Sequence, residues 1–193
     1  MVLPASPNFD QLAAGLSEPL RRYLARLSGD SAIAEDLLQE TMVRIARGLP
    51  GFEGRSSTKT WAFSIATRVA ADHFREPTHR VHVVEIDEAC ELTDHDIAVD
   101  QRLVVDEMNH CVREVIDSLP EDYRAALVLH DLEGHTAAEV AAVCDCSLAT
   151  AKIRIHRARA RLRSAMQEQC DFYRDSESVL RCDRKTDPPC RSG

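Results

Sequence analysis

Apolar residues recur at every third or fourth position through most of the chain, and this spacing limits the fold more than any other feature. The first such run of apolar residues would lie on one face of a helix and consists of Leu20, Tyr23, Leu24 and Leu27. Gly29 follows that run, and Gly48 with Pro50 follows the next one. Such runs are typical of amphipathic helices that end at glycine or before proline. No segment alternates convincingly as a strand would, so the sequence predicts an all-α fold.

The same signals give the expected order of helices. We expect one helix up to Gly29 and others over residues 31–48, 58–75, 97–118, 120–133, 136–143 and 147–169. Thr136 and Glu139 have the spacing of a capping box, in which each side chain satisfies an unpaired amide of the first turn.

The 193 residues are enough for two small domains. We expect a first helical domain at 1–76, an acidic linker at 77–96, a second helical domain at 97–169 and a cysteine-containing tail at 170–193.

The net charge of −8 argues at first against nucleic acid, but the charge is unevenly distributed. Residues 85–107 hold nine acids and one base, which accounts for a net −8 in that stretch alone. Residues 147–163 hold six bases and no acid: Lys152, Arg154, Arg157, Arg159, Arg161 and Arg163. This polarity predicts a basic binding surface beside an acidic connector.

The two helices around Cys144-Asp145-Cys146 form a helix-turn-helix pattern. On the second helix one apolar line is expected to dock on the domain, through Ala151, Ile155, Ala158 and Leu162. Thr150, Lys152 and Arg154 would then reach base edges, and the later arginines would reach phosphates. The alternative is a helix made basic for solubility, but such helices usually carry acids as well.

These residues resemble two regions of extracytoplasmic-function sigma factors. Region four is resembled at residues 119–120, 123–124, 133–136, 139–141 and 150–159. Region two is resembled at residues 34–41, 52–57 and 60–61. The two resemblances occur in the family's order, with the acidic stretch between them.

The resemblance implies a promoter-specificity subunit of bacterial RNA polymerase, with core RNA polymerase, promoter DNA and a candidate anti-sigma factor as partners. The implied core-polymerase contacts are Asp36, Leu38, Gln39 and Glu40. The implied minus-ten contacts are Arg55, Ser56 and Lys59. The implied minus-thirty-five contacts are Thr150, Lys152, Arg154 and Arg157. Ile153 replaces the small polar residue expected there, which leaves the base preference open.

Five of the seven cysteines lie late in the chain: Cys144, Cys146, Cys170, Cys182 and Cys190. They are candidate ligands of a regulatory metal ion or a redox site, and free reduced thiols are the alternative. Cys146 and Cys170 stand at opposite ends of one helix, about 36 Å apart at a rise of 1.5 Å per residue, so they cannot bind the same ion. No cofactor is otherwise required.

The sequence lacks the motifs of an enzyme, and neither a signal peptide nor a membrane span is evident, so we expect a cytoplasmic binding protein without membrane insertion. Two other functions remain open. One is a dimeric helix-turn-helix transcriptional regulator that does not associate with core polymerase, and the other is a metal-handling or redox protein. The promoter sequence and the inducing signal cannot be inferred.

Overall fold

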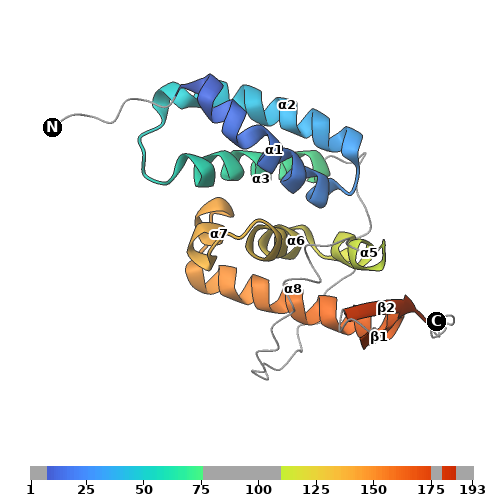
Figure 1. Ribbon diagram of the computed structural model, residues 1–193. Coiled ribbons are helices and arrows are strands. Elements are labelled where there is room, and N and C mark those ends of the chain that lie inside the picture. Colours follow the sequence, from blue (N-terminus) through green and yellow to red (C-terminus); the bar gives the residue numbers. More distant parts are fainter. Residues whose placement is uncertain (1–7, 76–109, 175–179, 186–193) are drawn as a thin grey trace.

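Two helical domains lie one above the other in the computed structural model, which describes residues 8–75, 110–174 and 180–185 (Figure 1). The first domain consists of α1 (Phe9–Ser28), α2 (Ser31–Gly48), the 3₁₀ turn η1 (Leu49–Gly51) and α3 (Thr58–Arg75). The second consists of α5 (His110–Ser118), α6 (Glu121–Leu127), the π-helical turn η3 (Val128–Leu132), α7 (Ala137–Val143) and α8 (Leu148–Gln169). Two strands follow, β1 (Cys170–Arg174) and β2 (Leu180–Arg184).

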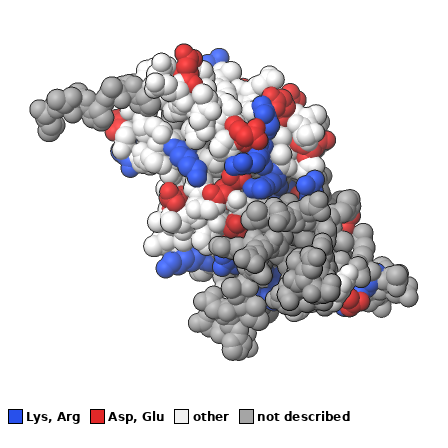
Figure 2. All heavy atoms as spheres, in the orientation of Figure 1, with Lys and Arg blue, Asp and Glu red and all other residues white. Residues whose placement is uncertain are grey.

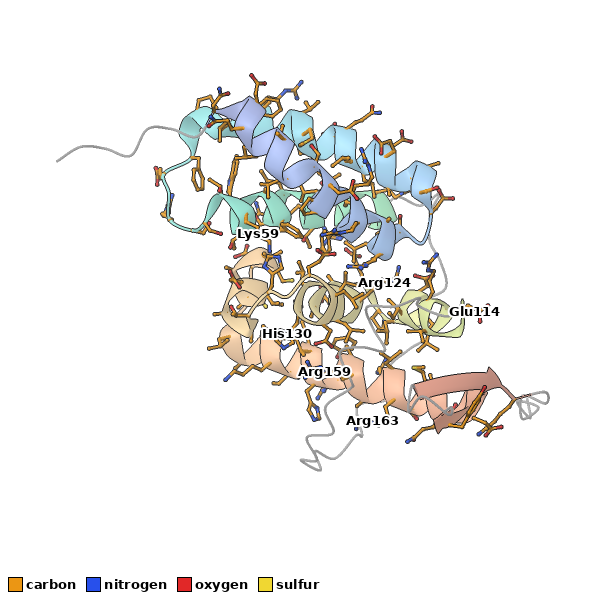
Figure 3. All side chains as sticks on the ribbon, in the orientation of Figure 1. Lys59, Glu114, Arg124, His130, Arg159 and Arg163 are labelled. Atoms are coloured by element: carbon orange, nitrogen blue, oxygen red, sulfur yellow. The ribbon has the colours of Figure 1, made fainter. Side chains whose placement is uncertain are left out.

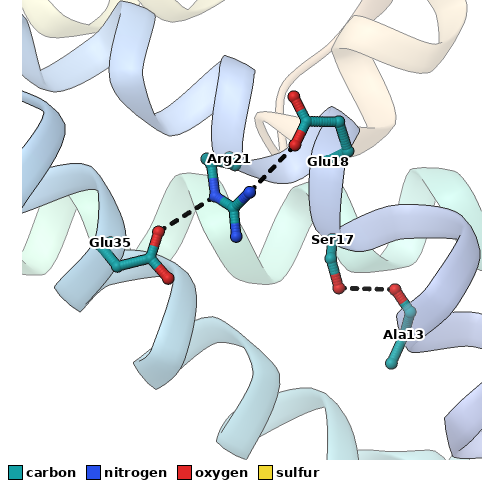
Figure 4. Close-up of polar contacts among 5 residues, drawn as sticks. All are labelled: Ala13, Ser17, Glu18, Arg21 and Glu35. Atoms are coloured by element: carbon teal, nitrogen blue, oxygen red, sulfur yellow. Dashed lines mark hydrogen bonds and ion pairs between the residues drawn. The ribbon is translucent and has the colours of Figure 1, made fainter.

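Local signals set the helix ends of the first domain. The Asn8 and Asp30 side chains accept hydrogen bonds from the first turns of α1 and α2. Gly29 ends α1 at φ +69°, a left-handed conformation that glycine adopts without strain. Between α1 and α2, Arg21 bridges Glu18 and Glu35, each at 3.0 Å (Figure 4). The helices are therefore capped by short-range contacts and joined by a surface ion-pair network.

Apolar packing holds the three helices of the first domain together. Leu20, Tyr23, Leu24 and Phe63 are fully buried. The Tyr23 hydroxyl shares a hydrogen bond of 2.8 Å with Thr67 Oγ1, so its polar atom is satisfied inside the core.

In the second domain the capping box is present. Glu139 N–H donates to Thr136 Oγ1, and Thr136 N–H donates to the Glu139 carboxylate at 2.8 Å. The long α8 packs on this domain through Ala151, Ile155 and Ala158, all buried as the spacing predicts. α8 therefore presents its opposite side away from the domain.

The two domains also pack on each other. α3 lies against α7 and α1 lies against η3 (Figure 1). Phe63 of α3 meets the ring of His135 at 4.7 Å between centroids, and the Arg124 guanidinium donates to the Leu27 carbonyl at 2.8 Å. One apolar core cluster contains residues of both domains.

The all-α prediction holds for both domains, but the prediction of no strand is wrong for the tail. β1 and β2 form an antiparallel pair in which Phe172 and Cys182 are Cα partners. Two adjacent aromatic residues in β1 favour a strand, but five residues are too few for alternation to stand out in a sequence.

Two further differences concern helix bounds. The helix predicted at 120–133 is divided, because α6 continues as the π-helical turn η3. The predicted linker and the first part of the helix predicted at 97–118 lie outside the described residues. Among the helices that the structure describes, none has the length and apolar character required to cross a membrane.

Candidate nucleic-acid interface

The outer side of α8 is the candidate DNA-binding surface. Lys152, Ile153, His156 and Arg157 are exposed there, with Ala149 one turn before Ile153. Figure 2 shows Lys and Arg side chains gathered along the edge of the second domain where α8 lies. His156 is absent from the contacts predicted by sequence, although its spacing of four residues from Lys152 places both on the outer side.

Two arginines of α8 are instead held by acids of the same domain. Arg154 donates to Asp122 of α6 at 2.6 Å, and its side chain is only 20% exposed. Arg159 donates to both carboxylate oxygens of Asp131, with Nε at 2.9 Å. Both guanidiniums are therefore held toward the domain by their acidic partners.

The four predicted minus-thirty-five contacts are thus arranged in two groups. Lys152 and Arg157 lie on the outer side of α8. Thr150 is half-buried, and its hydroxyl is bonded to Ser147 Oγ at 2.8 Å next to the helix start. Arg154 is paired with Asp122.

The turn before α8 holds two of the candidate metal ligands, Cys144 and Cys146. Asp145 has φ +51°, and Cys146 N–H donates to the Ala141 carbonyl at 3.0 Å, which closes the turn. Cys144 and Cys146 are free thiols, both half-buried. Burial, followed by the neighbouring Cys146, raises the pKa of the Cys144 thiol to about 12, which opposes the thiolate form that metals require.

The other candidate ligands are not brought to this turn by any described contact. Cys170 lies in β1 and Cys182 in β2, and Cys190 lies outside the described residues. Within residues 8–75, 110–174 and 180–185, no group of three or more His, Cys, Asp or Glu side chains is placed to hold a metal ion. The metal site stays a prediction.

The predicted polymerase-binding residues lie on α2. Asp36, Gln39 and Glu40 are exposed, whereas Leu38 is 4% exposed and belongs to the core of the first domain. Arg44 forms an ion pair with Glu40 at 2.8 Å and a second one with Asp72 of α3 at 3.1 Å. The outer side of α2 therefore presents carboxylates and an amide, while Leu38 helps to hold the helix in place.

The predicted minus-ten residues lie in the loop before α3 and in its first turn. Gly54 has φ +70°, and the exposed Arg55 pairs with Glu53 at 2.8 Å. Ser56 is exposed as well. Lys59 lies on the side of α3 that faces α7 (Figure 3), with its Nζ 5.7 Å from the centre of the Phe63 ring.

Two buried titratable side chains, His135 and Glu133, contact the first domain. The His135 ring is 2% exposed, and neither ring nitrogen has a hydrogen-bond partner among the residues that the structure describes. Burial and then the Lys59 charge lower the pKa of His135, which keeps the imidazole neutral. Glu133 receives Arg26 at 2.5 Å and Arg22 at 3.9 Å. Burial nevertheless raises the pKa of Glu133, since the charged carboxylate is removed from water.

Two helical domains, one with a helix-turn-helix whose outer side is basic, define a class of DNA-binding protein. The family model for Sigma-70 region 2 matches residues 13–80, and that for Sigma-70, region 4 matches residues 109–162. The RNA polymerase sigma-H factor of Pseudomonas aeruginosa is 33% identical over 167 residues, which cover 82% of this chain and 86% of that protein. The ECF RNA polymerase sigma factor SigX of Bacillus subtilis is 33% identical over 177 residues, 88% of each.

Solved structures give the same result. The sigma factor RpoE of Bartonella quintana, in complex with the anti-sigma factor NepR, superposes with a TM-score of 0.62. That match has 25% identity and covers 82% of this chain and 96% of the other. The chain belongs to the sigma-70 family, in its extracytoplasmic-function (ECF) group, and carries both region 2 and region 4.

Proposed function

We propose that the protein directs core RNA polymerase to specific promoters, as a binding subunit in the cytoplasm and not as an enzyme. The observation that carries this proposal is the outer side of α8, where the cations Lys152 and Arg157 lie on either side of the exposed Ile153. Region 2 on the same chain supports polymerase association, which a helix-turn-helix regulator acting alone does not need.

Each domain has its own share of this function. On α2, the exposed Asp36, Gln39 and Glu40 are the proposed polymerase contacts, since exposed acidic and amide groups can orient docking. Arg55, Ser56 and Lys59 are the proposed contacts to the minus-ten element. Glycine at position 54 lets the backbone come close to a base that has left the stack.

The second domain would hold the minus-thirty-five element as duplex DNA. Lys152 and Arg157 project from the outer side of α8 and can reach phosphates or base edges of a major groove. The acids that hold Arg154 and Arg159 also keep α8 oriented on its domain, which supports a defined angle of entry.

Promoter-dependent transcription by purified components tests the proposal. Core polymerase is mixed with this protein and with a library of promoter fragments, and run-off transcripts are sequenced. We expect transcripts that start at defined positions only when the protein is present. The proposal fails if the protein never confers specific initiation, and a footprint on palindromic DNA without polymerase would indicate a dimeric regulator instead.

Control by a separate anti-sigma factor is part of the proposal. Support comes from the similarity to RpoE, which was solved with the anti-sigma factor NepR. Metal or redox control through the cysteines is a second hypothesis, and repeating the transcription assay with chelator or with thiol-binding metals tests it.

A further inference from the structure

An apolar side chain occupies the outermost line of α8. Ile153 is 47% exposed, although large apolar side chains are mostly buried in the part of the chain that the structure describes. At about 100° per residue, Ile153 lies about 200° around the helix from Ala151. Because Ala151 is fully buried against the domain, Ile153 points away from it.

The neighbours of Ile153 make an apolar ridge with cations beside it. Ala149 stands one turn earlier on the same side, and Ala160 two turns later. Lys152 and His156 flank the ridge on one side and Arg157 on the other. In a DNA groove, such flanking groups face the two phosphate backbones while the ridge faces the base edges.

The arginine and lysine side chains that commonly read guanine stand beside this ridge and not on it. Arg154 and Arg159 are held by Asp122 and Asp131, whereas Lys152 and Arg157 flank the ridge. The large side chain on the ridge itself is isoleucine, which can form no hydrogen bond to base edges.

In the major groove, the C5-methyl of thymine is the apolar group that a base pair presents. We infer that Ile153 is a specificity-determining residue, which selects thymine in the promoter duplex by contact with that methyl group. This inference rests on the proposed function, since it requires α8 to enter the groove of a promoter element. In the protein without DNA, the Ile153 side chain is exposed to water. Contact with the thymine methyl therefore removes apolar surface of both partners from solvent.

The test uses holoenzyme assembled from core polymerase and the full chain. Promoters are first selected from a library whose upstream element is randomised. At each thymine that the upstream element requires, thymidine is then replaced by deoxyuridine, which lacks only the C5-methyl. Binding of each duplex promoter is measured with wild-type holoenzyme and with Ile153→Ala.

At one thymine we expect deoxyuridine to weaken wild-type binding about fourfold, the equivalent of one buried methyl-sized group. Ile153→Ala should bind thymidine and deoxyuridine promoters equally, because it has lost the group that detects the methyl. Tyr173→Ala is the control, since Tyr173 is a similarly exposed large apolar side chain on β1, outside the contacts proposed for polymerase and promoter. That variant should respond to deoxyuridine as wild type does.

Two results overturn the inference: an upstream element that requires no thymine, or an equal loss on deoxyuridine for wild type and Ile153→Ala. Alanine favours an exposed helix at least as well as isoleucine, so an unchanged thermal unfolding midpoint should accompany the variant. Failure of the proposed function is recognised differently, because then no promoter is selected even by wild-type holoenzyme.

Discussion

Arg124 shows how one side chain can join the two domains. Its guanidinium, labelled in Figure 3, donates to the carbonyl oxygens of Leu27 and Leu119 at 2.8 and 3.1 Å and to that of Asp117. Leu27 belongs to the last turn of α1, where a cation is also favoured by the helix dipole. Burial lowers the pKa of Arg124, and the nearby charges of Asp117 and Glu121 act in the opposite direction.

Arg124→Ala should therefore destabilise the protein by about 2–3 kcal/mol, because three carbonyls lose a charged donor inside the fold. Arg124→Lys should recover only part of the loss, since one ammonium cannot reproduce the planar fork. Urea unfolding of the full chain measures both. The control is Arg47→Ala, an exposed arginine in the last turn of α2, with an expected change within about 0.5 kcal/mol. Equal midpoints for Arg124→Ala and Arg47→Ala would contradict the bridging role.

Lys152 and Arg154 provide a comparison of two cations on the same helix. Lys152 is exposed on the outer side of α8, whereas Arg154 is paired with Asp122. Lys152→Ala should weaken promoter binding by holoenzyme and lower the slope of log affinity against log salt by about 1, as expected for one lost phosphate contact. Arg154→Ala should leave that slope nearly unchanged. A larger slope change for Arg154→Ala would show that Arg154 leaves Asp122 to meet DNA.

At the scale of elements, the capping box of α7 sets where the helix-turn-helix begins. Thr136→Ala removes the acceptor of the Glu139 amide and should lower the free energy of unfolding by about 1 kcal/mol. Thr136→Ser keeps the hydroxyl and should stay within a few tenths of wild type. Chemical denaturation followed by circular dichroism compares the three proteins. A loss for Thr136→Ser as large as for Thr136→Ala would assign the effect to the methyl group of threonine and not to the cap.

Elements with local signals could be predicted from the sequence. Gly29 and the capping box act within one helical turn, so their residues are visible together in the chain. The docking line of α8 follows from its helical period alone. The pairing of Arg154 with Asp122 could not be predicted in this way, since the partners are 32 residues apart and meet only after α6 and α8 pack. The helical period of apolar residues predicts which side of α8 is buried. It does not predict which arginines form ion pairs with acids.

The packing of one domain on the other could not be predicted from the sequence either. The contact between Phe63 and His135 joins residues that look like ordinary core positions of separate domains. The same holds for the candidate site. Lys59, a predicted minus-ten contact, is exposed on the side of α3 that faces α7 (Figure 3), and only the tertiary structure shows that position.

At the scale of the whole molecule, this packed arrangement cannot hold both promoter elements at once. The minus-ten and minus-thirty-five elements lie about 25 base pairs apart, which is roughly 85 Å at 3.4 Å per pair. Here α7 separates α3 from α8, and two successive helix packings span roughly 20 Å. The domains must separate when the protein binds a promoter with the polymerase.

Fluorophores placed by unnatural amino acids at exposed Ala46 and Ser164 report that separation. Energy transfer should be high in the free protein and should fall when core polymerase is added. Arg26→Glu should lower it in the free protein, because two carboxylates then face each other where Arg26 meets Glu133. Arg21→Glu is the control, since the acids that pair with Arg21 in the described part of the chain, Glu18 and Glu35, both belong to the first domain. Low transfer in the free wild-type protein would contradict the packed arrangement.

Domain packing should also depend on pH through His135. In the packed form the pKa of His135 lies below its ordinary 6.5, so the separated form binds the proton more readily. The neutral imidazole therefore stabilises the packed form fully above about pH 6.5. This stabilisation is lost as the pH falls from 6.5 toward the lowered pKa of the packed form. Lys59 acts in the same direction as burial, and Glu139 acts in the opposite one. Glu133 also opposes it, because its raised pKa lets the packed form take up a proton on acidification.

Comparison with His135→Phe isolates the histidine, since phenylalanine keeps an aromatic ring beside Phe63 and cannot be protonated. Between pH 7.5 and 5.5, energy transfer in the wild-type protein should fall further than in His135→Phe. The pH-dependent change in energy transfer that remains in His135→Phe then reports Glu133 and the other acids. If Glu133 dominates, energy transfer in this variant should rise as the pH falls. Identical pH profiles for the two proteins would mean that the imidazole is not buried between the domains in solution.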